Sequence, residues 1–148
     1  MRSRERSIKR LKTVGIVIHR AEVFTADDYH FCINRDGTLK QIVPLTDKGA
    51  HAIVFNGTTI AIAVFGDFAA LEPGANSRPT QSQLDTCVAL IRSLNALYGN
   101  VLWVAGHSQL GQTATDVPSK LTYGHTCPGE NFPLADVVLK SGAKAYKP

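Results

Sequence analysis

The chain of 148 residues has few cysteines, no long apolar run and no internal repeat. Its three cysteines form no CxxC pair, which excludes a disulfide-stabilised scaffold and the usual paired-cysteine zinc motifs. No apolar run approaches the roughly 20 residues that a membrane-spanning helix needs. Charged residues make up 19% and hydrophobic residues 44%, a balance that excludes a disordered or collagen-like chain. The length fits one domain with a substantial core.

The net charge of +4 is concentrated at the N-terminus. Residues 1–12 contain six basic residues and one acid, whereas the remainder contains ten basic and eleven acidic residues. We therefore expect a basic, flexible arm at 1–12, followed by a near-neutral domain at 13–148. Such an arm suits contact with nucleic acid, anionic lipid or an acidic wall polymer, although a solvated, frayed terminus is the commoner explanation. Because the domain itself has no basic excess, no nucleic-acid partner is expected.

The apolar stretch after this arm, at 14–18, is too short for the h-region of a secretory signal peptide. It also runs directly into His19 and Arg20. The sequence therefore predicts synthesis in the cytoplasm without an evident signal peptide.

Hydrophobic patterning predicts a mixture of strands and helices. Five short segments have the composition of strands: 13–18, 29–34, 38–43, 58–65 and 100–105. The clearest helix begins at a capping box of Thr80 and Gln83 and ends at Gly99. Its predicted apolar face comprises Leu84, Val88, Ile91, Leu94 and Leu97. With a short closing helix at 133–140, this succession favours a single α/β domain with a central mixed β-sheet flanked by helices.

Two histidines and one cysteine form the candidate site. His19 and His107 each come directly after a predicted strand, so they meet at one sheet edge if those strands are parallel neighbours. Cys127 precedes a Pro-Gly turn and could complete a His₂Cys set, which together with a water is the layout of a catalytic zinc site. The spacing alone leaves two alternatives open: structural histidines, or a Cys127 nucleophile with His107 or His125 as its base. Cys32 and Cys87 lie in apolar runs and are expected to be buried.

Six motifs in the same order resemble those of the zinc-dependent N-acetylmuramoyl-L-alanine amidases, the family of phage amidase endolysins and peptidoglycan recognition proteins. They are a YHF-then-DG hairpin at 29–37, a GxHA segment at 49–52, an asparagine and strand at 56–62, a PT-x-Q helix start at 79–83, GHS at 106–108 and CPG at 127–129. The resemblance covers residues 13–140. It implies the amidase and recognition-protein fold, peptidoglycan as the partner, and hydrolysis of the bond between N-acetylmuramic acid and L-alanine.

The resemblance also implies roles for individual residues. His19, His107 and Cys127 would hold one Zn²⁺ per chain. Tyr29 matches the tyrosine that positions the attacking water or stabilises the oxyanion, and His125 stands where phage amidases carry a catalytic lysine.

Two further residues in the matching motifs, His51 and Asn56, are expected to contact substrate, although a structural hydrogen-bonding role for His51 is equally open. His30 alternates with Tyr29 along its strand and is expected to be packed inside the domain.

The sequence departs from the family pattern on both sides of the site. Only ten residues separate His19 from Tyr29, where phage amidases insert a helix that forms one wall of the groove. The span from His107 to Cys127 is correspondingly long, at twenty residues, and we expect the extra loop at 110–124 to replace that wall. The imidazole at His125 would change the pH dependence of the reaction.

The compact size, the absence of a signal peptide and the basic arm suit a monomeric phage endolysin that acts on the bacterial cell wall. The arm would then contact anionic envelope surfaces. A non-catalytic peptidoglycan-binding module is the first alternative. An amidase for muropeptide recycling or toxin delivery is the second.

Overall fold

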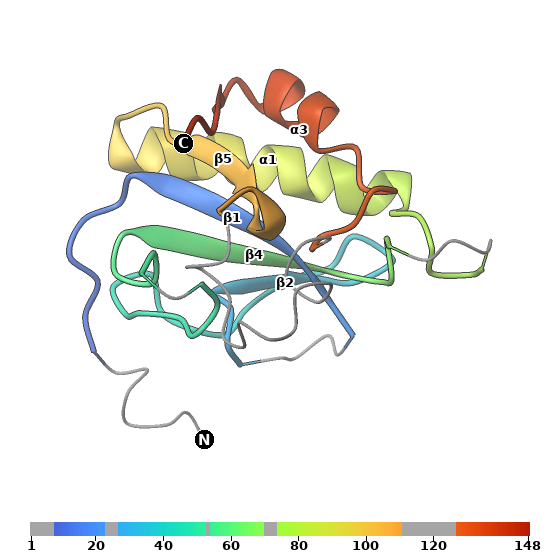
Figure 1. Ribbon diagram of the computed structural model, residues 1–148, viewed down its shortest axis with the longest axis horizontal. Helices are drawn as coiled ribbons and strands as arrows, with labels where there is room; N and C mark the ends of the chain where they lie inside the picture. Colours follow the sequence, from blue (N-terminus) through green and yellow to red (C-terminus); the bar gives the residue numbers. More distant parts are fainter. Residues whose placement is uncertain (1–7, 23–26, 53, 70–73, 111–126) are drawn as a thin grey trace.

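The computed structural model describes residues 8–22, 27–52, 54–69, 74–110 and 127–148. A six-stranded sheet forms the centre of the domain (Figure 1), with the strand order β3-β2-β4-β1-β5-β6. The strands are β1 (Gly15–Ala21), β2 (Phe31–Ile33), β3 (Leu39–Gln41), β4 (Thr59–Phe65), β5 (Trp103–Gly106) and β6 (Lys144–Ala145). All neighbouring strands are parallel except β2 and β3, which form an antiparallel hairpin. The predicted mixed α/β sheet is therefore confirmed.

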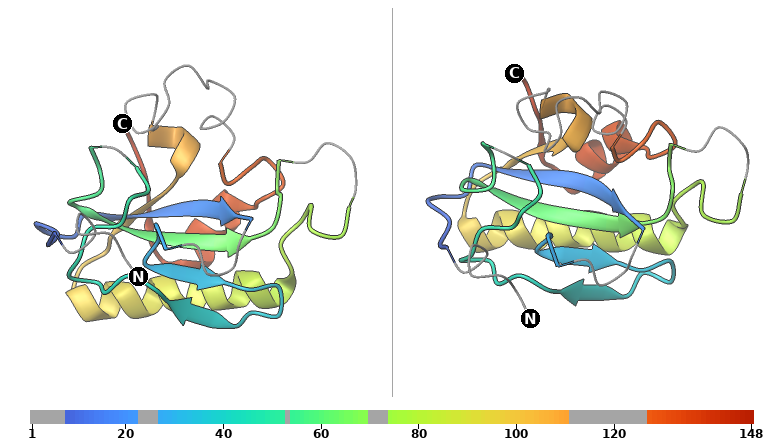
Figure 2. Two further views of the ribbon diagram at one scale, coloured as in Figure 1. Left: turned by 90° about the horizontal axis from the view of Figure 1, so that it is seen from below. Right: turned by 60° about the horizontal axis from the view of Figure 1, so that its bottom comes forward.

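Two α-helices, α1 (Gln81–Tyr98) and α3 (Leu134–Ser141), pack together on one face of this sheet (Figure 1). A short 3₁₀ helix, η2 (His107–Leu110), follows β5 and lies on the other side of β1 from α1 in the left view of Figure 2. The main core lies between the sheet and the two helices, and a smaller apolar cluster around Val17 and Ala105 covers the opposite face. Because side chains alternate along a strand, β1 turns Ile16 and Ile18 toward the helices and Val17 and His19 toward the η2 side.

The strand predictions are right in kind but differ at the ends. β1 continues through His19 to Ala21, since its pairing with β4 runs as far as Ala21 opposite Phe65. The expectation that the strand ends at His19 is therefore wrong, although the imidazole still emerges near the carboxyl end. The two-residue strand β6 was not predicted, because so short an exposed segment carries no periodic signal.

Helix α1 begins with the predicted capping box and ends at the predicted glycine. The Thr80 side chain accepts from the Gln83 N–H, and Gly99 adopts a left-handed conformation with φ of 61°. Leu97, however, is 65% exposed, which contradicts its predicted place on the buried face. Cys87 and Leu90 are buried instead, so the buried face is rotated from the one that we predicted.

Gln83 is completely buried and does more than cap its helix. Its Oε1 accepts from the N–H of Thr80 and from the guanidinium of Arg35, at 3.0 Å each. Its Nε2 donates to the carbonyls of Ile33 (3.3 Å) and Phe65 (2.9 Å). This single amide therefore joins the first turn of α1 to the carboxyl ends of β2 and β4.

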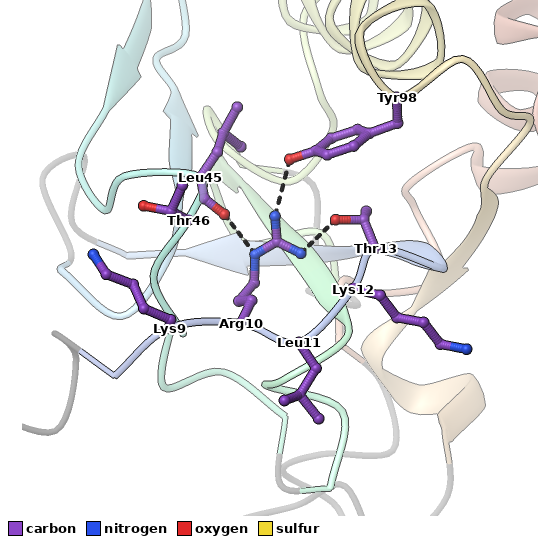
Figure 3. Close-up of a pocket in the computed structure, with 8 residues that line it drawn as sticks. All are labelled: Lys9, Arg10, Leu11, Lys12, Thr13, Leu45, Thr46 and Tyr98. Carbon is purple, nitrogen blue, oxygen red and sulfur yellow. Dashed lines mark hydrogen bonds between the residues drawn. The ribbon is translucent and has the colours of Figure 1, made fainter.

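The described part of the expected basic arm is tied to the domain. Lys9 pairs with Asp47 at 2.6 Å, and the backbone N–H of Arg10 donates to Thr46 at 2.8 Å. The Arg10 guanidinium donates to the Leu45 carbonyl, the Thr13 hydroxyl and the Tyr98 hydroxyl (Figure 3). Residues 9 and 10 of the expected arm thus contact the rest of the domain, whereas residues 1–7 lie outside the described part of the chain. Among the described helices, none combines the length and the apolar character needed to cross a membrane.

Candidate metal site

Three segments distant in sequence bring their side chains together at the carboxyl end of the central strands. The pairing of β1 with β5 places Ile18 opposite Gly106, so His19 and His107 come next on neighbouring parallel strands. Their ring centroids are 4.7 Å apart. The Sγ of Cys127 lies 3.8 Å from the Nδ1 of His19, and one ligand atom from each of the three residues lies within 4.8 Å of the others. The predicted His₂Cys cluster therefore exists in the fold.

Cys127 is held by a tight turn against two neighbouring segments. Its carbonyl accepts from the N–H of Ser108 at 2.9 Å, which ties it to η2. It is followed by a cis proline and then by Gly129, with φ of 115°. A Cβ on Gly129 would lie 2.3 Å from the carbonyl carbon of Phe68, so only glycine fits at this position.

Burial favours the neutral forms of His19 and Cys127. Burial, and then the charges of His51 and His107, holds the pKa of His19 well below its usual 6.5. Burial also raises the pKa of the Cys127 thiol to about 11, although Arg20 opposes this shift. A neutral imidazole is the form that binds a metal, whereas the thiol must lose its proton to do so. A bound divalent cation would favour the thiolate form of Cys127.

The donor set and its dimensions fit Zn²⁺. Tetrahedral zinc with bonds of about 2.0–2.3 Å places its sulfur and nitrogen ligands roughly 3.5 Å apart, close to the 3.8 Å between Cys127 and His19. Two imidazoles and one thiolate favour zinc over calcium or magnesium, which prefer oxygen. Three protein ligands leave the fourth position open for a water or a substrate oxygen.

Tyr29 is half-buried beside this cluster. Its ring centroid lies 4.9 Å from that of His19. The other predicted catalytic residue, His125, and most of the long loop at 110–124 lie outside the described residues. The prediction that this loop replaces a wall of the groove therefore stays a prediction.

Asn56 and His51 form part of the support behind the cluster. The Oδ1 of Asn56 accepts from the backbone N–H groups of His51 (3.0 Å) and Ala52 (2.9 Å). His51 is only 4% exposed, and its Nδ1 lies 2.9 Å from the Nε2 of His19. These contacts give both residues a structural role, and the predicted contact with substrate stays a prediction.

His30 is fully buried and bonds to the backbone on both sides. Its Nε2 donates to the Asp47 carbonyl at 2.8 Å, and its Nδ1 accepts from the Ala61 N–H at 3.0 Å. This arrangement confirms the expectation of a packed, structural histidine. Burial lowers its pKa from 6.5 to about 4.

The sequence matches the N-acetylmuramoyl-L-alanine amidase family over residues 4–130. The chain belongs to this family. The match takes in all three residues of the His₂Cys cluster. It also begins inside the expected basic arm, in keeping with the contacts of Lys9 and Arg10.

Solved structures support the same fold. The endolysin amidase LysCS from Clostridium intestinale is 24% identical, with a TM-score of 0.68, and the match covers 95% of this chain and 88% of that one. The Ph2119 endolysin of a Thermus scotoductus bacteriophage is 19% identical, with a TM-score of 0.61 and coverage of 93% and 89%. Drosophila peptidoglycan recognition protein SA is 14% identical, with a TM-score of 0.67 and coverage of 95% and 86%. A search of curated protein sequences gives no match.

Sequence reasoning missed Thr59, the first residue of β4. Its hydroxyl lies 3.2 Å from the Nε2 of His51 and is fully buried. Its only sequence signal is a polar residue at the start of an otherwise apolar strand, which is also typical of a strand end.

Proposed function

We propose that this family member is a zinc-dependent amidase that hydrolyses the bond between the lactyl group of N-acetylmuramic acid and L-alanine, as a phage-type endolysin. The observation that carries the proposal is the convergence of His19, His107 and Cys127 in a chain that matches the amidase family. A Zn²⁺ ion held there would polarise the amide carbonyl and lower the pKa of a water near it.

The remaining steps fall to side chains around the cluster. The Tyr29 ring lies beside that of His19. We assign its hydroxyl to a hydrogen bond with the oxyanion that forms when water adds to the carbonyl carbon. We assign His125 to the same oxyanion or to the delivery of a proton to the L-alanine nitrogen. The C–N bond then breaks, leaving a lactyl carboxylate and a free amine.

The decisive experiment is digestion of purified peptidoglycan with and without a chelator, scoring newly exposed L-alanine amino groups. We expect new termini that disappear with the chelator and return with zinc. His19→Ala, which removes a ligand, is the matched inactive control. Binding to peptidoglycan without new termini would instead identify a recognition module.

The recognition module is the second candidate because recognition proteins share this fold. One similar structure is of the ectodomains of recognition proteins LCa and LCx with bound tracheal cytotoxin, at 19% identity and a TM-score of 0.66. The short connection between His19 and Tyr29 also favours an altered groove. Activity on soluble muropeptides rather than on intact sacculi would instead indicate an enzyme of recycling, whereas killing of neighbouring cells after export would indicate a toxin.

We further propose that the N-terminal basic region holds the protein on anionic envelope surfaces. Lys9, Arg10 and Lys12 line a cavity of about 560 Å³, shown in Figure 3. Of these three cations, Lys9 is already paired with the Asp47 carboxylate. Removal of residues 1–7 together with Lys12→Ala should weaken binding to sacculi at low salt. Lys40→Ala, on the exposed strand β3, is the control for charge alone. Binding that is unchanged by the first variant would refute this role.

A further inference from the structure

A buried chain of hydrogen bonds extends behind the candidate metal site. The Nε2 of His19 lies 2.9 Å from the Nδ1 of His51, and the Nε2 of His51 lies 3.2 Å from the Oγ1 of Thr59. All three residues are at most 4% exposed. Each imidazole therefore depends on its protein partner, since bulk water does not reach it.

The Thr59 hydroxyl determines which atom donates and which accepts in each of these hydrogen bonds. The Thr59 hydroxyl has one proton, which it donates to the Phe55 carbonyl at 2.8 Å. Toward His51 the same oxygen acts only as an acceptor, so the Nε2 of His51 carries a proton. With Nε2 as the donor toward Thr59, the neutral ring of the buried His51 has its lone pair on Nδ1, the atom that faces His19.

The same reasoning extends to His19. The Nδ1 of His51 accepts, so the Nε2 of His19 donates, and the lone pair of a neutral His19 ring is on Nδ1. This is the atom that lies 3.8 Å from the Sγ of Cys127. In the opposite tautomer, an N–H group at Nδ1 would point into the cluster, and two lone pairs would meet between the histidines.

We propose that Thr59 and His51 are positioning residues, which fix His19 in the tautomer that presents the Nδ1 lone pair to a divalent cation. This inference rests on the metal site of the proposed function. Thr59 acts through two hydrogen bonds, one between Thr59 and His51 and one between His51 and His19, and is not itself a metal ligand. Partners that orient a metal-bound histidine commonly contribute about 10- to 100-fold to metal affinity.

The central variant is Thr59→Val, which keeps the shape of the side chain but removes the hydroxyl. The Phe55 carbonyl still accepts from the N–H of Thr58 at 3.1 Å, so the substitution leaves it with a partner. We expect zinc affinity, measured by competition with a chromophoric chelator, to fall by about 10- to 100-fold. Thr59→Ser retains the hydroxyl, so its zinc affinity should equal that of the wild type.

Thr58→Val is the matched control, because its hydroxyl lies 3.5 Å from the same carbonyl but is not part of the chain to His19. Its zinc affinity should equal that of the wild type. Equal affinity in Thr59→Val and wild type would overturn the inference. A wild type that binds no zinc would refute the proposed metal site itself, so the two failures are distinguishable.

A second measurement needs no variant. Imidazole ¹⁵N shifts of the metal-free wild-type protein report directly which ring nitrogen carries the proton. We expect His19 and His51 both to be protonated at Nε2. A proton at Nδ1 of His19 would refute the proposal, even if Thr59→Val failed to fold.

Discussion

The buried imidazole of His30 predicts a specific loss of stability in acid. Its pKa is about 4 in the folded protein and 6.5 when the ring is exposed. Above pH 6.5 neither state binds the proton, so the group has no effect. Between pH 6.5 and 4 only the unfolded chain binds it, so the free energy of unfolding falls as the pH falls. Below pH 4 both states are protonated and the loss stops growing.

The size of this effect follows from the shift. Each pH unit in that window costs about 1.4 kcal/mol, so lowering the pH from 7.5 to 4.5 should cost about 2.5 kcal/mol through His30 alone. His30→Gln is the matched variant, because an amide can also donate to Asp47 and accept from Ala61 without titrating in this range. Groups that do not interact with His30 titrate equally in both proteins and cancel in the comparison, whereas burial, and then the charge of His30, lowers the pKa of His51.

The assay is urea unfolding at pH 7.5 and 4.5, followed by circular dichroism with chelator present. We expect the wild type to lose about 2.5 kcal/mol more than His30→Gln over this interval. Parallel losses in the two proteins would refute the reasoning, whatever their absolute stabilities, because the linkage depends only on the difference between folded and unfolded pKa.

Three further predictions concern a metal ligand, the glycine in the turn after it, and the buried amide of Gln83. Cys127→Ser should lower zinc affinity more than 100-fold in the chelator competition assay, since it removes a ligand rather than a partner of one. Gly129→Ala should lower the free energy of unfolding by about 2–4 kcal/mol in urea, because its Cβ would strike Phe68, whereas Gly74→Ala, with nothing within 4 Å, should be near neutral. Gln83→Met should cost about 3 kcal/mol in the same assay, because it leaves the carbonyls of Ile33 and Phe65 without their amide donor.

The sequence predicted those features that depend on local chemistry or on a general rule of sheet topology. The capping box of Thr80 and Gln83 is a contact within one turn, and it is present as predicted. The adjacency of His19 and His107 followed from a rule about parallel strands, and the register of β1 and β5 confirms it. The motif at 127–129 predicted a turn that brings the cysteine to the same edge.

These rules did not predict the side-chain contacts that Gln83, Lys9 and Arg10 make with distant segments, or the exposure of Leu97. Gln83 was predicted as a cap, but its buried bonds to Ile33 and Phe65 depend on where β2 and β4 end. Leu97 fits the helical period yet is exposed, because the position of α3 decides which residues of α1 are covered. Lys9 and Arg10 read as part of a charged tail, but their partners lie more than thirty residues away at Asp47 and Leu45.

Two of the buried histidines, His30 and His51, show how the partner decides the role of a side chain. His30 and His51 are both covered, both have each ring nitrogen in a hydrogen bond, and both have lowered pKa values. His30 bonds only to backbone groups, so its replacement should change stability and leave zinc affinity untouched. His51 instead bonds to the imidazole of His19, and so its hydrogen-bonding pattern is transmitted to an atom that faces the metal site. Burial and residue type are equal in the two cases, and the identity of the bonded neighbour separates a structural histidine from one that serves the site.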